Sequence, residues 1–149
     1  MIRKIVFIIF IIQISFFYKL SHADISIIVK IDDEIITNYD IKKESNYLKI
    51  LNPNAKSLKD SQISKLAKTS LINEIIKKKE IKKFLNLNES NEFLNQYLND
   101  LYSRLDYKDE KEFLIELEKT NNYDLNQIKK KINIELLWNE LIFLKYKNQ

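Results

Sequence analysis

The sequence predicts a mainly α-helical fold in which a short N-terminal β-hairpin packs on a bundle of about five helices. Two patterns and the chain length support this class. Apolar residues alternate with a period of two over residues 25–37, and from residue 39 onward they recur every three or four positions, which is the period of an amphipathic helix. The chain has 149 residues, enough for one modest domain but not for two.

Residues 1–23 have the order of a secretory signal peptide. They begin with the positive residues Arg3 and Lys4, continue with an apolar run, and end in Ser21–His22–Ala23, which places small residues at the two positions that a signal peptidase recognises. The apolar run has about 14 residues, fewer than the roughly 20 that a membrane-spanning helix needs. We therefore expect this segment to be removed, which leaves residues 24–149 as a single mature domain. The alternative interpretation is an uncleaved membrane anchor.

The hairpin is expected over residues 25–37. The alternation runs over residues 25–31, Asp32–Asp33–Glu34 interrupts it, and Ile35–Ile36–Thr37 resumes it. Because two strands alone are only marginally stable in water, the apolar face of the hairpin must pack on the helices. The residues expected on that face of the first strand are Ile25, Ile27, Val29 and Ile31.

Five helices are expected after the hairpin. Short polar side chains that cap helices mark three of the starts, with Asn38 before the first helix, Asp109 at the fourth and Asp124 before the last. Asn52–Pro53–Asn54 ends the first helix, and Thr120–Asn121–Asn122 is an expected turn before the last. The helices are expected over residues 39–51, 61–85, 89–105, 109–119 and 125–147.

The last predicted helix is apolar on two roughly opposite sides. A helix of this kind must be buried on both sides or offered to a partner. Two interpretations stay open. Either the bundle covers one stripe and the hairpin the other, or part of the second stripe, centred on Trp138, is a surface for apolar ligands or another subunit. The first stripe consists of Leu125, Ile128, Ile132, Leu136 and Phe143, and the second of Ile134, Leu137, Trp138, Leu141 and Leu144.

The residues that the chain lacks argue against an enzyme. It has no glycine, no cysteine and a single histidine, which lies in the signal segment. Without glycine there is no phosphate-binding loop or dinucleotide fingerprint, and without cysteine there is no disulfide or cysteine zinc site. Glu112 and Glu116 share a predicted solvated face, where neither carboxyl has a neighbour that would suit it for acid catalysis. We therefore expect no catalytic residue, no metal site and no cofactor.

The basic balance of the chain does not indicate a nucleic-acid partner. The formal net charge is +4, and it falls to +1 once the signal segment, with its three basic residues and no acid, is removed. The runs Lys77–Lys79 and Lys129–Lys131 lie near Glu74, Glu80 and Glu135, so they do not form the one-signed stripe that nucleic-acid binding requires. We expect these runs to be solvated helix faces.

The segment that joins the hairpin to the first helix resembles a known family. Asp33–Ile41 reads Asp-Glu-Ile-Ile-Thr-Asn-Tyr-Asp-Ile and resembles the N-terminal domain of the SurA family of periplasmic chaperones and peptidyl-prolyl isomerases. Leu71–Glu74 is similar to the Leu-Ile-x-Glu of the family's central helix, and Ile132–Leu137 is similar to its last helix. The resemblance covers residues 24–149.

The chain departs from this family in two ways. The glycines that usually end the central helix and precede the last helix are replaced by Phe84–Leu85 and Asn121–Asn122. Nothing in the sequence corresponds to the parvulin-type isomerase domains, or to the C-terminal segment that completes the N-terminal domain in the family. The resemblance therefore implies a non-catalytic chaperone and does not imply prolyl isomerisation.

A chaperone of this kind would be periplasmic, in a Gram-negative-type cell, and would hold unfolded outer-membrane protein chains in an apolar, aromatic groove. The alternatives are a structural or assembly subunit of the cell envelope, which would bind one folded partner or form a homodimer through the last helix, and the N-terminal part of a split isomerase. Neither nucleic acid nor stable membrane insertion is expected once the signal segment is removed. The residues expected to line the groove are Trp138, Phe143, Tyr97, Tyr102 and Leu141.

The mass of the N-terminal peptide of the exported protein tests the signal-peptide prediction. We expect that peptide to begin at Asp24, because the peptidase cuts after the small residue Ala23. The substitution Ala23→Lys is expected to abolish cleavage, whereas Lys19→Gln should leave it intact. A membrane-bound wild-type chain that still begins at Met1 would contradict the prediction and favour the anchor.

Overall fold

Five α-helices, one 3₁₀-helix and a two-stranded sheet make up the described part of the computed structural model, residues 24–119 and 123–147. The mainly helical class and the N-terminal hairpin are confirmed. The predicted signal segment, residues 1–23, and the turn predicted at Thr120–Asn121–Asn122 lie outside the described residues. In chain order the elements are β1 (Ile27–Ile31), β2 (Glu34–Thr37), α2 (Asn38–Leu51), η1 (Pro53–Ser57), α3 (Asp60–Ile81), α4 (Leu94–Arg104), α5 (Glu110–Glu118) and α6 (Leu125–Tyr146).

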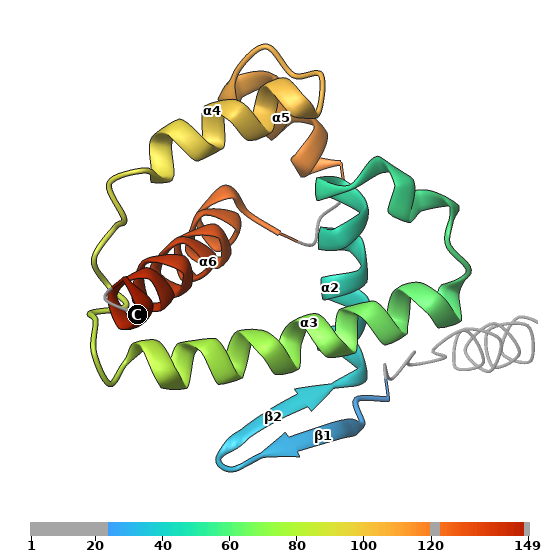
Figure 1. The fold of residues 1–149 in the computed structure, drawn as a ribbon. Helices are drawn as coiled ribbons and strands as arrows, with labels where there is room; N and C mark the ends of the chain where they lie inside the picture. The colour runs from blue at the N-terminus through green and yellow to red at the C-terminus, as the bar shows by residue number, and fades with distance from the viewer. Residues whose placement is uncertain (1–23, 120–122, 148–149) are drawn as a thin grey trace, which may run out of the picture.

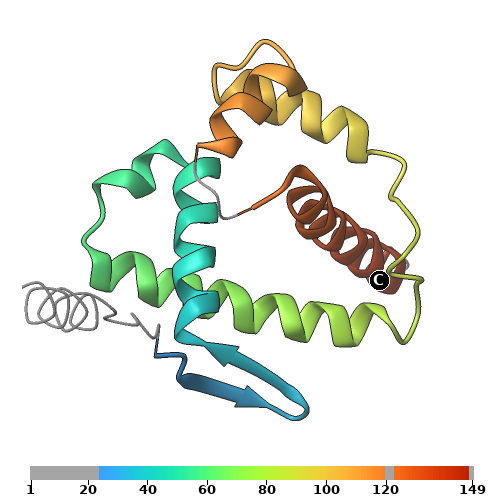
Figure 2. The ribbon, with the colours of Figure 1, turned by 180° about the vertical axis from the view of Figure 1, so that it is seen from behind.

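The helices are arranged as a ring (Figure 1). α2 crosses α3 steeply, α6 lies beside the C-terminal part of α3, and α4 and α5 close the ring on the side opposite α3. The hairpin lies against α2 and α3, on the side of α3 away from α6, as the view from behind also shows (Figure 2). The hairpin is therefore not in a position to cover α6.

The hairpin is confirmed, but its buried face differs from the predicted one. The strands pair antiparallel, and Ile28 is an extra residue that forms a β-bulge in β1. Because a bulge breaks the strict alternation of side chains, the start of β1 turns out of the packed face. Ile25 and Ile27 of the predicted face are exposed, and Val29 and Ile31 are half-buried. The buried residue of the hairpin is Ile36 of β2.

The N-cap of α2 is Thr37, not the predicted Asn38. Thr37 has extended backbone, its Oγ1 accepts a hydrogen bond from the N–H of Asp40 at 3.2 Å, and Asp40 Oδ2 accepts from the N–H of Thr37 at 2.8 Å. This is a capping box, which needs an extended first residue, and Asn38 is already helical. The Asn38 side chain instead accepts from the N–H of Ser26 at 3.0 Å and donates to the carbonyl of Asp24 at 2.7 Å, so it ties the start of the chain to α2.

The predicted caps of α5 and α6 are confirmed. Asp109 Oδ1 accepts from the N–H of Glu112 at 2.9 Å, and Asp124 Oδ1 accepts from the N–H of Gln127 at 2.8 Å. Each carboxylate satisfies a backbone donor that has no partner inside the helix, and its negative charge suits the positive end of the helix dipole. Both helices begin within one residue of the predicted start.

The two middle helices are shorter than predicted. α3 ends four residues early, at Ile81, and α4 begins five residues late, at Leu94, so residues 82–93 form a connecting loop. The loop is held by local turns and by hydrogen bonds to α6. The N–H of Asn91, for example, donates to Oδ1 of Asn133 at 2.7 Å. Apolar spacing continues through the loop, which is why the sequence pattern predicts helix there.

Two apolar clusters form the core of the described residues. The first lies where α4 and α5 meet α2 and the start of α6, and the second lies where the end of α3 meets the second half of α6. The first cluster consists of Tyr47, Leu94, Leu98, Leu101, Tyr102, Phe113, Leu117, Ile128 and Ile132. The second consists of Ile81, Ile134, Leu137 and Leu141, with Leu85, Leu87 and Trp138 packed against it.

The two apolar stripes of α6 divide between these clusters. The first stripe contributes to the first cluster, and the second stripe packs on the end of α3. The expectation that the hairpin covers the second stripe is therefore wrong, because α3 lies between them. Beyond Leu141 the coverage ends, and Ile142, Phe143 and Leu144 are exposed.

Replacing the cap of α2 tests its assignment. We expect Thr37→Ala to lower the free energy of unfolding by about 1 kcal/mol, because the N–H of Asp40 loses its acceptor and the Asp40 carboxylate loses the hydroxyl donor of Thr37. The matched control is Thr69→Ala, since Thr69 is exposed within α3 and its hydroxyl bonds only a carbonyl of the same helix. Equal effects of the two substitutions in urea unfolding would contradict the assignment.

Candidate binding groove on the last helix

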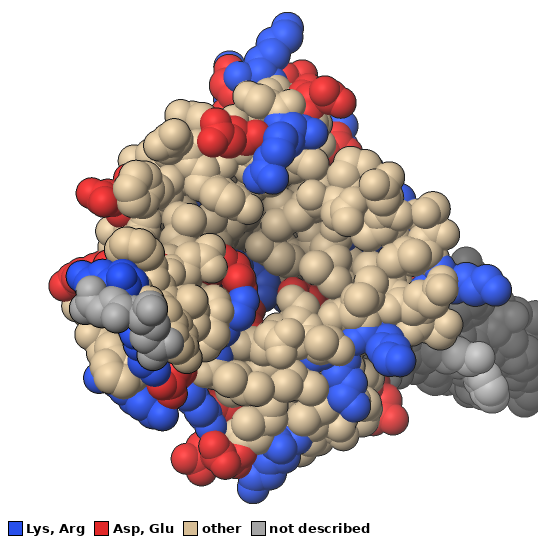
Figure 3. Space-filling model, in the orientation of Figure 1, with Lys and Arg blue, Asp and Glu red and all other residues tan. Residues whose placement is uncertain are grey.

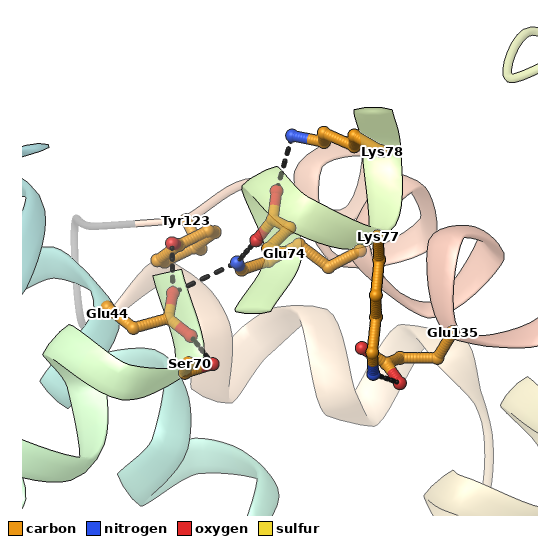
Figure 4. Close-up of polar contacts among 8 residues, drawn as sticks. Glu44, Ser70, Glu74, Lys77, Lys78, Tyr123 and Glu135 are labelled. Atoms are coloured by element: carbon orange, nitrogen blue, oxygen red, sulfur yellow. Dashed lines mark hydrogen bonds and ion pairs between the residues drawn. The ribbon is translucent and has the colours of Figure 1, made fainter. Parts of the chain in front are cut away.

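A buried carboxylate holds α6 in position. Glu44 of α2 is completely buried, yet both of its oxygens have partners from other segments (Figure 4). Ser70 Oγ of α3 donates to Oε1 at 2.7 Å, and Tyr123 OH donates to Oε2 at 3.0 Å. The Lys131 ammonium of α6 lies 3.0 Å from Oε2. Because an unpaired buried charge is very costly, these contacts hold α2, α3 and α6 in one arrangement.

A second carboxylate completes this ionic network. Glu74 of α3 pairs with Lys131 and, at 2.5 Å, with Lys78 of its own helix. Burial raises the pKa of Glu74, but the two ammonium groups outweigh burial and hold that pKa below its ordinary value of 4.5. Glu74 therefore stabilises the fold above pH 4.5, and this contribution is lost as the pH falls through the lowered pKa.

Two tyrosine rings enclose the network. The ring centres of Tyr47 and Tyr123 are 5.1 Å apart, and the Lys131 ammonium lies 5.0 Å from the centre of the Tyr47 ring. Burial, and then the Glu44 carboxylate, raise the pKa of both phenols, so both stay neutral. Every buried side-chain nitrogen and oxygen within the described residues has a hydrogen-bond partner. The described side chains of the network are therefore engaged with one another.

An apolar groove runs beside the second half of α6. It has a volume of about 820 Å³ and lies between α6 and the loop of residues 82–93. We call it the α6 groove. Phe143 is 65% exposed and Phe93 is 56% exposed, so both rings are open to solvent. The large apolar residues that line the groove are Leu85, Phe93, Leu136, Leu137, Phe143 and Leu144.

The polar part of the α6 groove is acidic. Its described lining contains three carboxylates and no lysine or arginine. Negative charge beside an apolar surface attracts cationic segments and disfavours acidic ones. The polar lining residues are Asn86, Glu89, Ser90, Asn91, Glu92, Asn139 and Glu140.

Hydrogen bonds hold the loop wall of the groove against α6. Asn133, buried on α6, accepts from the N–H of Asn91 and donates from Nδ2 to the carbonyl of Glu89 at 2.8 Å. The Asn91 side chain in turn donates to Glu140 Oε2 at 2.9 Å. The oxygen and the nitrogen of the Asn133 side-chain amide thus both hold the loop. The groove is a preformed feature of the fold.

The end of α6 is also tied down. Lys145 donates to Glu80 Oε1 of α3 at 2.9 Å, and its ammonium lies 4.5 Å from the centre of the Phe84 ring. Hydrogen bonds from Lys83 and Lys145 lower the pKa of Glu80 to about 2. These contacts hold the last turns of α6 against α3, so the exposed apolar residues there lie on an anchored helix.

The structure places only one of the five predicted lining residues in the α6 groove, and that residue is Phe143. Tyr102 and Leu141 are buried in the two core clusters, and Trp138 is half-buried against the second cluster. Tyr97 is 38% exposed on α4, where the Arg104 guanidinium lies 5.4 Å from its ring centre. The four residues do not line the groove, because periodicity identifies an apolar side of a helix but not its neighbour.

Most residues of the α6 groove were not predicted from the sequence. Phe93 lies within the helix predicted over residues 89–105, but it precedes the first residue of α4 and its ring is exposed. Leu136 and Leu144 belong to the predicted stripes of α6, so the apolar stripes did contain a signal for this wall. The opposite wall is an irregular loop whose position depends on Asn91 and Asn133, and no local pattern indicates that pairing.

No protein-family model, curated protein or solved structure matches the chain. The resemblance to the SurA family therefore rests on the motif residues quoted above. Among the residues that the structure describes, no helix is long and apolar enough to cross a membrane, and no three His, Cys, Asp or Glu residues are grouped so that they could hold a metal ion.

Removing the shared ammonium tests the structural role of the network. We expect Lys131→Met to lower the free energy of unfolding by about 3–5 kcal/mol, because Glu44 would keep a buried charge without an ammonium partner and Glu74 would keep only Lys78. Adding Glu44→Gln and Glu74→Gln should restore part of this loss. The control is Lys119→Met, which breaks an exposed pair with Glu116 and should cost less than about 1 kcal/mol. Similar losses in the two lysine variants would show that the network does not organise the fold.

Proposed function

We propose that this protein is a periplasmic holdase that binds unfolded outer-membrane protein chains and catalyses no reaction. The observation that carries the proposal is the α6 groove, in which two phenylalanine rings stay exposed on walls that are held in place. An exposed apolar surface with a polar rim is typical of sites that bind another polypeptide. The resemblance of Asp33–Ile41 to the SurA family supports the choice of client and compartment.

Binding in such a groove requires no reactive group. Apolar client side chains gain about 25 cal/mol for each Å² of apolar surface removed from water. Part of this gain is lost because the client segment must become ordered. The net affinity of one segment is therefore low. A client is held by several weak contacts and released without an energy source.

The acidic rim gives the groove a preference among clients. Glu89, Glu92 and Glu140 line it with no basic residue among the described lining. Segments in which aromatic residues lie next to lysine or arginine fit this surface, whereas acidic segments are repelled. Because these carboxylates are exposed to water, added salt weakens the preference.

A homodimer through α6 is the second candidate, and the exposed Ile142, Phe143 and Leu144 favour it. In that case a second copy would cover the α6 groove, and the protein would be an assembly subunit of the cell envelope. Light scattering and a dye that binds apolar surface separate the two functions. A monomer that binds the dye supports the holdase, and a dimer that does not bind it supports the assembly subunit.

Removing the two exposed rings tests the holdase proposal. The substitutions Phe93→Ser and Phe143→Ser together should weaken client binding about tenfold or more, because each ring contributes buried apolar area only in the complex. The measurement is the aggregation of an outer-membrane β-barrel protein that is diluted from urea, followed by light scattering. The holdase is added in the form in which it is purified after expression of the full chain.

The matched control is Ile115→Ser, since Ile115 is an exposed apolar residue of α5 outside the groove. It should suppress aggregation as well as the wild type does. The proposal fails if the wild type has no effect at several-fold molar excess over the client. It also fails if the double phenylalanine variant, shown to be folded by circular dichroism, is as active as the control.

A further inference from the structure

A second cavity lies inside the ring of helices. It has a volume of about 580 Å³ and is lined by residues of α2, α3, α6 and the loop of residues 82–93, together with Leu94 of α4 and Tyr123. The space-filling view shows a hollow at the centre of this face, with lysine and acidic side chains visible inside it (Figure 3). We call it the central cavity. Its volume is within the range of sites that bind small molecules.

The central cavity is basic, in contrast to the α6 groove. Its described lining contains one acidic residue, Glu74, and five lysines. The ionic network accounts for part of this charge, because its two ammonium groups are balanced by its two carboxylates. The lysines are Lys43, Lys78, Lys129, Lys130 and Lys131.

Two lysines of the central cavity have no carboxylate partner among the residues that the structure describes. Lys129 pairs with Glu110 at 3.0 Å. The Lys43 ammonium lies 4.6 Å from the centre of the Tyr123 ring, and among the described residues neither Lys43 nor Lys130 has an ion-pair partner. Lysines that converge in a concave site with low-dielectric walls raise the local concentration of anions. The cavity therefore favours a ligand with a negative head group.

Part of the wall of the central cavity is apolar. An inorganic anion alone would leave this wall in contact with water, so the wall favours a ligand that also has an apolar part. Lysine ammonium groups act as point charges, so they pair with a carboxylate or with a phosphate. The apolar lining residues are Leu71, Leu87, Leu94 and Ile134.

We propose that the central cavity binds a small amphipathic anion, with its carboxylate or phosphate head beside Lys43 and Lys130 and its apolar tail against the four apolar residues. A free fatty acid and a single-chain lipid phosphate share this chemistry. The site is separate from the α6 groove, so it does not depend on the holdase proposal.

Titration calorimetry with decanoate and with decyl phosphate, each below its micellar concentration, tests the site. The protein is used in the form in which it is purified after expression of the full chain. We expect one molecule to bind per chain. Octanoate should bind about tenfold more weakly than decanoate, since each buried methylene contributes a factor of three to four. Tighter binding of decanoate identifies a fatty acid as the natural source, and tighter binding of decyl phosphate identifies a lipid phosphate.

The double variant Lys43→Met/Lys130→Met should weaken binding of either anion at least tenfold. The control Lys65→Met/Lys111→Met makes the same change in net charge at two exposed lysines outside the cavity, and should bind within twofold of the wild type. The Phe93→Ser/Phe143→Ser variant should also bind normally, which separates this site from the groove.

Three results would overturn the proposal. The first is that neither anion binds the wild type. The second is that a neutral decyl glucoside, or inorganic phosphate alone, binds as tightly as the amphipathic anions. The third is that the control double variant loses as much affinity as the cavity variant. Because the first two comparisons use the wild type, they decide the question even if the cavity variant fails to fold.

Discussion

The burial of the Glu44 carboxylate is the constraint on which the rest of the structure depends. A charge that leaves water must be paired and hydrogen-bonded, and its partners here come from α3, from Tyr123 in the segment before α6 and from α6 itself. No single helix pair could satisfy it. In its observed position α6 supplies the ammonium group that pairs with Glu44. The network therefore specifies one arrangement of three helices, whatever its net contribution to stability.

The position of α6 in turn produces two concave surfaces of opposite charge. Its second half extends past the core cluster at Leu141 and forms the acidic α6 groove with the loop that Asn133 holds. Its first half carries Lys129–Lys131 toward the middle of the ring, where they line the basic central cavity. The second half of this helix therefore lines the acidic α6 groove, and its first half lines the basic central cavity.

The basic runs illustrate how tertiary contacts change the meaning of a pattern. In the sequence, Lys77–Lys79 and Lys129–Lys131 were expected to be solvated faces, because acidic residues lie near them. In the structure Lys131 is largely buried between Glu44 and Glu74, while Lys130 stays exposed at the edge of the central cavity. The separation of Glu44 from Lys131 along the chain is too great for any local pattern to indicate their pairing.

The sequence by itself determined the hairpin, the order of the helices and the aspartate caps of α5 and α6. These features depend on side-chain periodicity and on hydrogen bonds between residues three positions apart, so neighbouring residues are enough to specify them. Only the tertiary structure decided which stripe of α6 meets α3, where α4 begins and which aromatic rings remain exposed. Those outcomes depend on charges and amides that pair across distant segments, as Glu44 does with Lys131 and Asn91 does with Asn133. The free energy of such a pairing exists only once both segments are in place.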